Sequence, residues 1–136
     1  MRYSVTVLIL LIACACLVTD ARGQKSVYKA MIDTDGVQKA DVLAGGYFFD
    51  PDHIVVKVNV PVELKVRKEP GIVPHDFVLK APDAGIDVLE SLGSEPKSIR
   101  FTPTKPGKYP FYCDKKLIFS KSHREKGMEG TLEVVE

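Results

Sequence analysis

Residues 107–135 read GKYPFYCDKKLIFSKSHREKGMEGTLEVV, and this stretch combines strand-like patterning with side chains that bind metals. Cys113 is followed after nine residues by His123, and Met128 follows after four more. A thiol, an imidazole and a thioether therefore share one loop between two predicted strands, and a second imidazole, His75, lies upstream in IVPHDFVL. Together these side chains are the ligand inventory of a trigonal His-His-Cys site with a long axial thioether.

This donor set favours copper. Cu(I) prefers soft sulfur and Cu(II) accepts imidazole nitrogen, so a mixed set of nitrogen and sulfur donors suits both oxidation states. Zinc also binds Cys and His, but Met128 favours copper because a thioether selects Cu(I). A dinuclear copper centre requires a second nearby cysteine, and residue 117 is Leu. The third histidine, His53, lies near a turn before a long strand, and we interpret it as a structural or surface residue.

Upstream of this stretch, the chain is strand-like from residue 26 onward. In HIVVKVNV (53–60), Ile54, Val56, Val58 and Val60 alternate with other residues, and VELKVRK (62–68) alternates in the same way. Such period-two patterning predicts strands with one buried face. The predicted strands are 26–32, 47–49, 53–60, 62–68, 75–80, 98–102, 108–112 and 132–135.

Turn signals separate these segments, among them Glu69-Pro70-Gly71, Pro82-Asp83 and Lys105-Pro106-Gly107. The window 86–92 (IDVLESL) is the only one with a helical pattern, and it is short. About seven or eight short strands in this length predict an all-β fold, an antiparallel Greek-key β-sandwich.

The N-terminus has the pattern of an export signal. Arg2 precedes an apolar run from Val5 to Val18, which is shorter than the roughly 20 residues of a membrane span. We expect residues 1–23 to be a cleaved signal peptide and residues 24–136 to be a single copper-binding domain. A second reading takes 11–14 (LIAC) as a lipobox, with Cys14 lipidated. Either way the domain is expected outside the cytoplasm, periplasmic or extracellular, with lipid anchoring at Cys14 as the alternative to a soluble form.

Composition, charge and cysteine count argue against several classes of protein. The chain has 136 residues, enough for one core, and its net charge of +1 argues against non-specific nucleic-acid binding. Of the three cysteines, Cys14 and Cys16 lie in the export segment, so the domain has no disulfide framework. An enzyme with Cys113 as nucleophile and His123 as base lacks an obvious orienting group, and we expect no enzymatic activity.

The sequence resembles the cupredoxin family of small blue, type 1 copper proteins, such as plastocyanin and azurin. Residues 107–113 (GKYPFYC) look like the family's strand into the cysteine, and residues 128–134 (MEGTLEV) look like its closing strand. Residues 49–66 are similar to the paired strands before the first histidine. The resemblance implies a copper ion bound by His75, Cys113 and His123, with Met128 as the weak axial ligand.

Two departures from the family pattern concern the surroundings of this site. The gap between Cys113 and His123 is longer than in most small members, which affects the surface around the metal. Asp76 follows His75 where the family commonly has an asparagine that ties the two ligand loops together. A carboxylate can still accept a hydrogen bond there, and its charge should favour the oxidised metal and lower the reduction potential.

These features predict a one-electron carrier with His123 as the exit on an exposed loop. The alternative is a copper carrier that delivers the ion. Between 105 and 126 the chain has seven cationic and two acidic residues, a local charge of +5. This run is either a solvated loop face or a surface that steers the acidic docking face of a cytochrome or oxidase partner. Ile118 and Phe119, extended by Ile72 and Val73, are either loop core or an exposed docking patch. Membrane contact is expected only through lipidation of Cys14.

Overall fold

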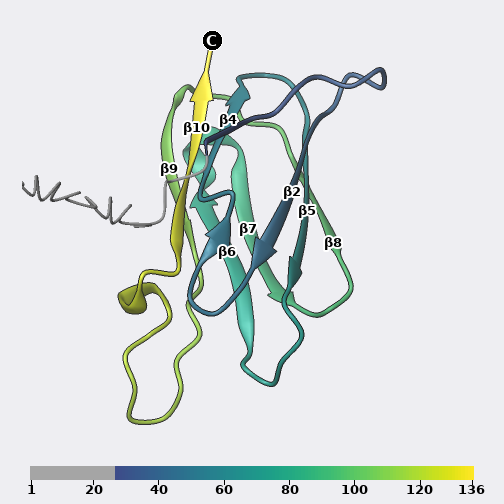
Figure 1. Cartoon of the computed structure of the whole chain (residues 1–136). Helices are drawn as coiled ribbons and strands as arrows, with labels where there is room; N and C mark the ends of the chain where they lie inside the picture. Colours follow the sequence, from purple (N-terminus) through teal and green to yellow (C-terminus); the bar gives the residue numbers. More distant parts are fainter. Residues whose placement is uncertain (1–26) are drawn as a thin grey trace, which may run out of the picture.

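The computed structural model describes residues 27–136, which form a sandwich of two β-sheets (Figure 1). The predicted signal peptide and Cys14 lie outside the described residues. Within the described part there is no α-helix, only two short 3-10 turns, Pro82–Ala84 and Arg124–Lys126. The strands are β1 (Val27–Lys29), β2 (Gln38–Ala44), β3 (Phe49–Asp50), β4 (His53–Lys57), β5 (Val62–Lys68), β6 (His75–Ala81), β7 (Ile86–Leu92), β8 (Lys97–Phe101), β9 (Gly107–Tyr112) and β10 (Glu129–Val135).

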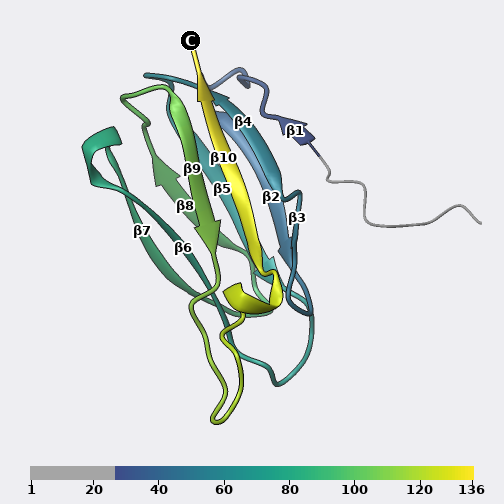
Figure 2. The same cartoon turned by 90° about the vertical axis from the view of Figure 1, so that its left-hand side faces the viewer.

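One sheet has six strands in the order β1-β4-β10-β9-β6-β7, and the other has four in the order β3-β2-β5-β8. Figure 2 looks onto the face of the six-stranded sheet, with its strands side by side in this order and the other sheet behind them. Inward-facing residues alternate along the strands, as in β2, where Gln38, Ala40, Val42 and Ala44 are buried. The all-β sandwich predicted from the period-two pattern is therefore confirmed.

The prediction that the sandwich is antiparallel is wrong, because both sheets are mixed. Strands β1 and β4 run parallel, as do β4 and β10 in the same sheet and β2 and β5 in the other. The reason is topological: β4 lies in the six-stranded sheet, so the chain leaves the four-stranded sheet between β2 and β5. A chain that crosses over before it returns can run in its original direction.

Two other elements differ from the prediction. Residues 86–92 form strand β7, not a helix, because every residue of β7 is paired in register with β6. This pairing overrides the helical preference of Leu and Glu. Strand β2 was not predicted, since its inward residues are a glutamine and small apolar side chains that give a weak pattern. The prediction of 62–68 matches β5 at both ends.

Three aromatic rings meet in the core between the sheets. Phe49 packs edge-on against Phe77 and Phe111, with ring centroids 5.6 and 5.3 Å away, and Phe77 stacks on Phe111 at 5.0 Å. Phe77 and Phe111 are fully buried. Because β6 and β9 supply these rings, the same two strands are held rigidly where they carry His75 and Cys113. Among residues 27–136, no helix has the length and apolar character needed to span a membrane.

Candidate metal centre

Strand register brings the predicted ligands together. β6 and β9 are antiparallel neighbours with Val78 opposite Tyr112, so the start of β6, His75, lies near the end of β9, which Cys113 follows. β10 is antiparallel to β9 with Glu129 opposite Tyr112, which places Met128 beside Cys113. The backbone N–H of Cys113 accordingly donates to the carbonyl of Met128, with N and O 3.1 Å apart.

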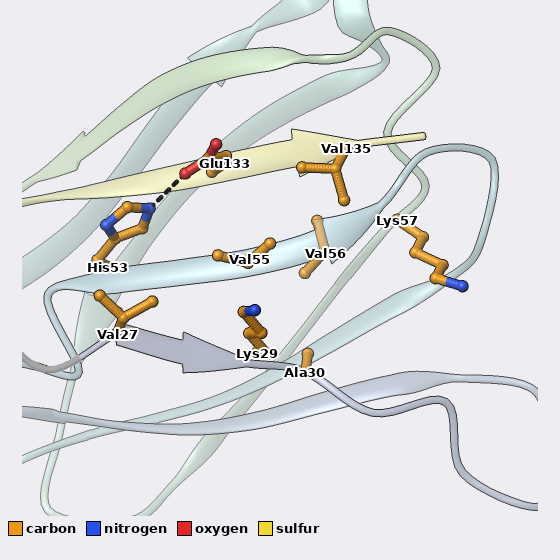
Figure 3. A pocket seen from close by; sticks show the side chains of 9 residues that line it. All are labelled: Val27, Lys29, Ala30, His53, Val55, Val56, Lys57, Glu133 and Val135. Carbon is orange, nitrogen blue, oxygen red and sulfur yellow. Dashed lines mark hydrogen bonds and ion pairs between the residues drawn. The ribbon is translucent and has the colours of Figure 1, made fainter.

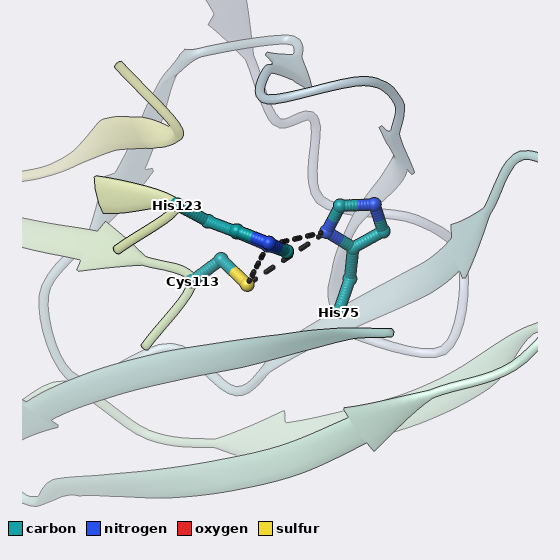
Figure 4. A group of neighbouring side chains, drawn as sticks. All are labelled: His75, Cys113 and His123. Atoms are coloured by element: carbon teal, nitrogen blue, oxygen red, sulfur yellow. Dashed lines mark hydrogen bonds between the residues drawn. The ribbon is translucent and has the colours of Figure 1, made fainter. Parts of the chain in front are cut away.

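His75, Cys113 and His123 converge on one point (Figure 4). Cys113 Sγ lies 3.4 Å from His123 Nδ1 and 3.8 Å from His75 Nδ1, and the two Nδ1 atoms are 3.2 Å apart. An ion held in a trigonal plane, ~2.0–2.3 Å from each donor, requires donors roughly 3.5–3.8 Å apart. The observed triangle is close to that size, so the three donors fit one metal ion.

The centre is shielded from solvent. Cys113 and His123 have no exposed surface, and His75 is 6% exposed. Burial raises the pKa of Cys113 to about 11, so the free thiol stays protonated at neutral pH. A buried thiol of this kind is a poor nucleophile for an external substrate, which weighs against Cys113 as a catalytic nucleophile.

Both histidines are held in the form that binds metals. Burial is the main cause that lowers the pKa of His75, and the neighbouring His123 lowers it further. The pKa of His123 is lowered by burial first and then by Lys126. Neutral imidazoles are therefore ready to bind a metal ion at neutral pH, whereas the Cys113 thiol must lose its proton to solvent when the thiolate binds a cation.

Asp76 ties the two ligand-bearing segments together, as predicted from the sequence. Its carboxylate Oδ1 accepts a hydrogen bond from the backbone N–H of Asp114 at 2.7 Å. Its own backbone N–H points at Cys113 Sγ, with N and S 3.4 Å apart. Lys115 Nζ lies 3.7 Å from Oδ2, so a cation partly balances the buried charge.

Met128 directly precedes β10 and is fully buried, and its backbone hydrogen-bonds to the backbones of Cys113 and His123. Its backbone N–H donates to the carbonyl of His123 at 3.0 Å. This position suits the predicted axial role of the thioether, which stays a prediction.

Tyr47 is a neighbour of the centre that the sequence did not reveal. Its ring packs edge-on against His123, with centroids 4.9 Å apart, and its hydroxyl accepts from Lys126 Nζ at 3.2 Å. The only local signal was the Gly45-Gly46 break, which indicates a turn. Because His123 is enclosed, the expectation that it presents an exposed edge is wrong, and His75 is the ligand with the exposed surface.

His53 lies outside the cluster, in agreement with the structural role expected for it. Its Nε2 atom is 2.7 Å from Glu133 Oε2 on the face formed by β1, β4 and β10 (Figure 3). The surrounding pocket is lined by valines and lysines, with no third metal-binding side chain among its lining residues.

Comparisons with known proteins agree with this geometry. No protein-family model matches the chain, and neither does any curated protein sequence. Among solved structures, the metal-binding domain of the Cu(I)-exporting P-type ATPase CopA of Streptococcus pneumoniae, solved with Cu(I), is 28% identical with a TM-score of 0.63. The alignment covers 84% of this chain and 100% of that one.

Two further structures are similar. A copper-binding protein solved in the apo form is 25% identical with a TM-score of 0.61, over 82% of this chain and 100% of its own. Auracyanin B is 20% identical with a TM-score of 0.55, over 79% of this chain and 94% of its own. The chain therefore has the cupredoxin fold that its sequence resembles, and His75, Cys113 and His123, with Met128 beside them, form a site that fits a single copper ion.

Proposed function

We propose that this chain is an exported type 1 copper protein that carries one electron at a time between redox partners. The observation that supports this proposal is the buried triangle of donors formed by His75, Cys113 and His123, whose size fits one metal ion. Bound copper would supply the Cu(II)/Cu(I) couple. The role of the chain is to hold the donors still, so that little rearrangement accompanies each change of charge.

Backbone hydrogen bonds around the donors support this role. The N–H of His123 donates to the carbonyl of Lys115 at 2.8 Å, so the two limbs of the ligand loop are joined just outside the site. The Asp76 carboxylate joins the loop to the start of β6. With the aromatic rings packed beneath, these contacts restrain all three donors at once.

A second candidate function is delivery of the copper ion itself. It is favoured by the similarity to the metal-binding domain of a Cu(I)-exporting ATPase. The burial of Cys113 favours retention instead, because an ion that is handed over must be reached by the acceptor's ligands.

One experiment separates the two functions. The copper-loaded protein is reduced and then reoxidised in the presence of an excess of a Cu(I) chelator, and the visible thiolate-to-Cu(II) absorption is measured before and after. An electron carrier recovers the full absorption, since the ion stays bound through the cycle. Loss of the absorption to the chelator within one cycle would support delivery and contradict electron carriage.

We also propose that the mature chain starts near Gln24, is exported, and meets a cytochrome or oxidase with an acidic docking face. The cationic residues between 105 and 126, which led us to predict this partner, lie in two separate places in the structure. Lys108 lies at the far end of β9, about 17 Å from Cys113 by strand rise, and Lys105 lies in the turn before β9, while Lys115, Lys116 and Lys121 lie on the ligand loop. We expect the association rate to fall with ionic strength, and a rate indifferent to salt would contradict steering.

A further inference from the structure

The loop between Cys113 and His123 has an exposed apolar turn at its apex. The N–H of Ser120 donates to the carbonyl of Leu117 at 3.1 Å, which closes a β-turn with Ile118 and Phe119 at its two central positions. Ile118 is 85% exposed and Phe119 is 104% exposed, so neither is loop core. We refer to these two residues as the apolar tip.

The backbone of the apolar tip is unfavourable for the residue that occupies it. Phe119 has φ of 59°, in the left-handed region that turns of this kind normally fill with glycine or asparagine. A bulky side chain in this conformation costs free energy, and a fully exposed ring regains none of it through packing. Folding stability therefore gives no reason for a phenylalanine here, which points to a contact outside the chain.

A second loop presents an exposed apolar residue at the same end of the molecule. Ile72, in the loop between β5 and β6, is fully exposed. Figures 1 and 2 show this loop and the ligand loop projecting from the same end of the sandwich, with the ligand loop reaching farthest. Two separate loops thus present aliphatic or aromatic groups to solvent beyond the metal centre.

Cationic side chains lie just behind the apolar tip. The ligand loop carries Lys115, Lys116 and Lys121, and no acidic residue lies between Lys115 and Ser122. An isolated antiparallel β-bridge between Lys116 and Ser122 joins the two limbs of the loop. Lys116 and Lys121 therefore lie on opposite limbs, each two residues from the apolar tip. Lys116 and Lys121 are exposed, and neither is engaged by a carboxylate closer than 4 Å within the described chain.

We propose that this end of the protein docks on an anionic lipid surface, with Ile118 and Phe119 entering the interface and Lys116 and Lys121 at the level of the phosphates. The order of groups along the loop, apolar at the apex and cationic behind, matches the order of hydrocarbon and phosphate across a bilayer interface. A projecting apolar apex can enter the boundary between headgroups and acyl chains while the lysines behind it stay among anionic headgroups. This docking needs neither the copper ion nor lipidation of Cys14, and it would turn the metal centre toward the membrane.

The chain contains no tryptophan, so a single introduced indole reports on its own surroundings. The test uses the full chain carrying Phe119→Trp, mixed with vesicles of phosphatidylcholine containing phosphatidylglycerol or with vesicles of phosphatidylcholine alone. We expect a blue shift of the emission with the anionic vesicles and at least a several-fold weaker response with the neutral ones. Adding Lys116→Gln and Lys121→Gln should weaken binding to the anionic vesicles about tenfold.

Leu89→Trp provides the matched control, because Leu89 is an exposed apolar residue midway along the edge strand β7. Its emission should not shift, even if the N-terminal segment itself holds the full chain on the vesicles. Equal shifts at 119 and 89, or no shift at 119, would overturn the proposal. A shift at 119 produced by poly-L-glutamate but not by vesicles would overturn it in favour of an acidic polypeptide, and a shift that grows with protein concentration alone would overturn it in favour of a second copy of the chain.

Phe119→Gly separates docking from folding. Glycine accepts the left-handed backbone of the turn, so the melting temperature should be unchanged or higher, while sedimentation with anionic vesicles falls several-fold. The visible absorption of the copper-loaded variant should stay as in the parent protein, so failure of this proposal is distinguishable from failure of the proposed metal site. A variant that sediments like the parent would contradict a role for the ring.

Discussion

Asp76 is a buried carboxylate that contacts both the backbone of the ligand loop and, through its own N–H, the sulfur donor. An asparagine at this position could keep the hydrogen bond from Asp114 through its amide oxygen, but it would remove the negative charge. Charge and hydrogen bonding are therefore separable at this single residue.

We expect Asp76→Asn to raise the reduction potential of the copper-loaded protein. The carboxylate stabilises the more highly charged oxidised ion, and Lys115 only partly offsets it. A rise on the order of 60 mV corresponds to about a tenfold change for one electron. Asp114→Asn, which removes an exposed carboxylate next to Cys113, is the control and should shift the potential less. An unchanged or lower potential in Asp76→Asn would reject this role of the charge.

The two ligand histidines also set a pH dependence of the metal-free protein. Burial lowers the pKa of both His75 and His123 below the ordinary value of 6.5, so the unfolded chain takes up protons that the folded chain refuses. The free energy of unfolding should be fully developed above pH 6.5 and should fall as the pH drops below it. Urea unfolding between pH 7.5 and 5.5 measures the slope, which should be smaller in His75→Gln; an equal slope would argue against this origin.

Sequence spacing was sufficient to predict that His75, Cys113 and His123 lie together, because their side-chain chemistry is rare in combination and their order follows the strands. The axial role of Met128 stays a prediction. Sequence spacing could not find Tyr47, whose contact with His123 depends on how the loop before β3 folds back. Sequence spacing also could not show that His123 is buried. Loop residues are exposed on average, and the residues that cover His123, such as Tyr47, are far from it in the sequence.

Among the elements, β5 was predicted with its bounds because Val62, Leu64 and Val66 alternate with charged residues. β7 was mistaken for a helix because Ile86, Leu89 and Leu92 also fit a helical spacing, and only pairing with β6 decides between the two. The parallel strand pairs were not predicted because the direction of pairing depends on which sheet each strand joins, and local sequence patterns do not show this.

The pairing of β9 and β10 beside the metal centre leaves no room for a methyl group at Gly130, so we expect fold stability to depend on this glycine. A Cβ built on Gly130 would lie 2.2 Å from the ring of Phe111 and 2.6 Å from the carbonyl oxygen of Asp52. One of these obstacles is backbone, so we expect Gly130→Ala to destabilise the fold by about 1–3 kcal/mol. Gly46→Ala is the matched control, since nothing lies within 4 Å of its added Cβ. Chemical denaturation measures both, and equal stabilities would contradict the close packing.

At the scale of the whole molecule, the sandwich places its metal donors, the cationic ligand loop with its apolar tip, and the loop that carries Ile72 at one end (Figures 1 and 2). The net charge of +1 gives no sign that cationic residues gather at this end. Because folding brings together three donors that lie far apart in the sequence, metal binding should stabilise the native state over the unfolded chain.

Copper should therefore raise the melting temperature. A ligand at about 100 times its dissociation constant adds ~2.7 kcal/mol, which corresponds to an increase on the order of 10 °C for a domain of this size. Calorimetry with and without one equivalent of copper measures the shift. Cys113→Ser should lose most of it, and a shift retained in that variant would place the ion elsewhere.

The most direct measurement is a titration of the protein with Cu(II) followed by visible absorption. An intense thiolate-to-Cu(II) band should grow to saturation at one equivalent and should be absent in Cys113→Ser, which keeps Cys14 and Cys16. A protein that stays colourless, or a band that survives in Cys113→Ser, would contradict a copper site built from His75, Cys113 and His123.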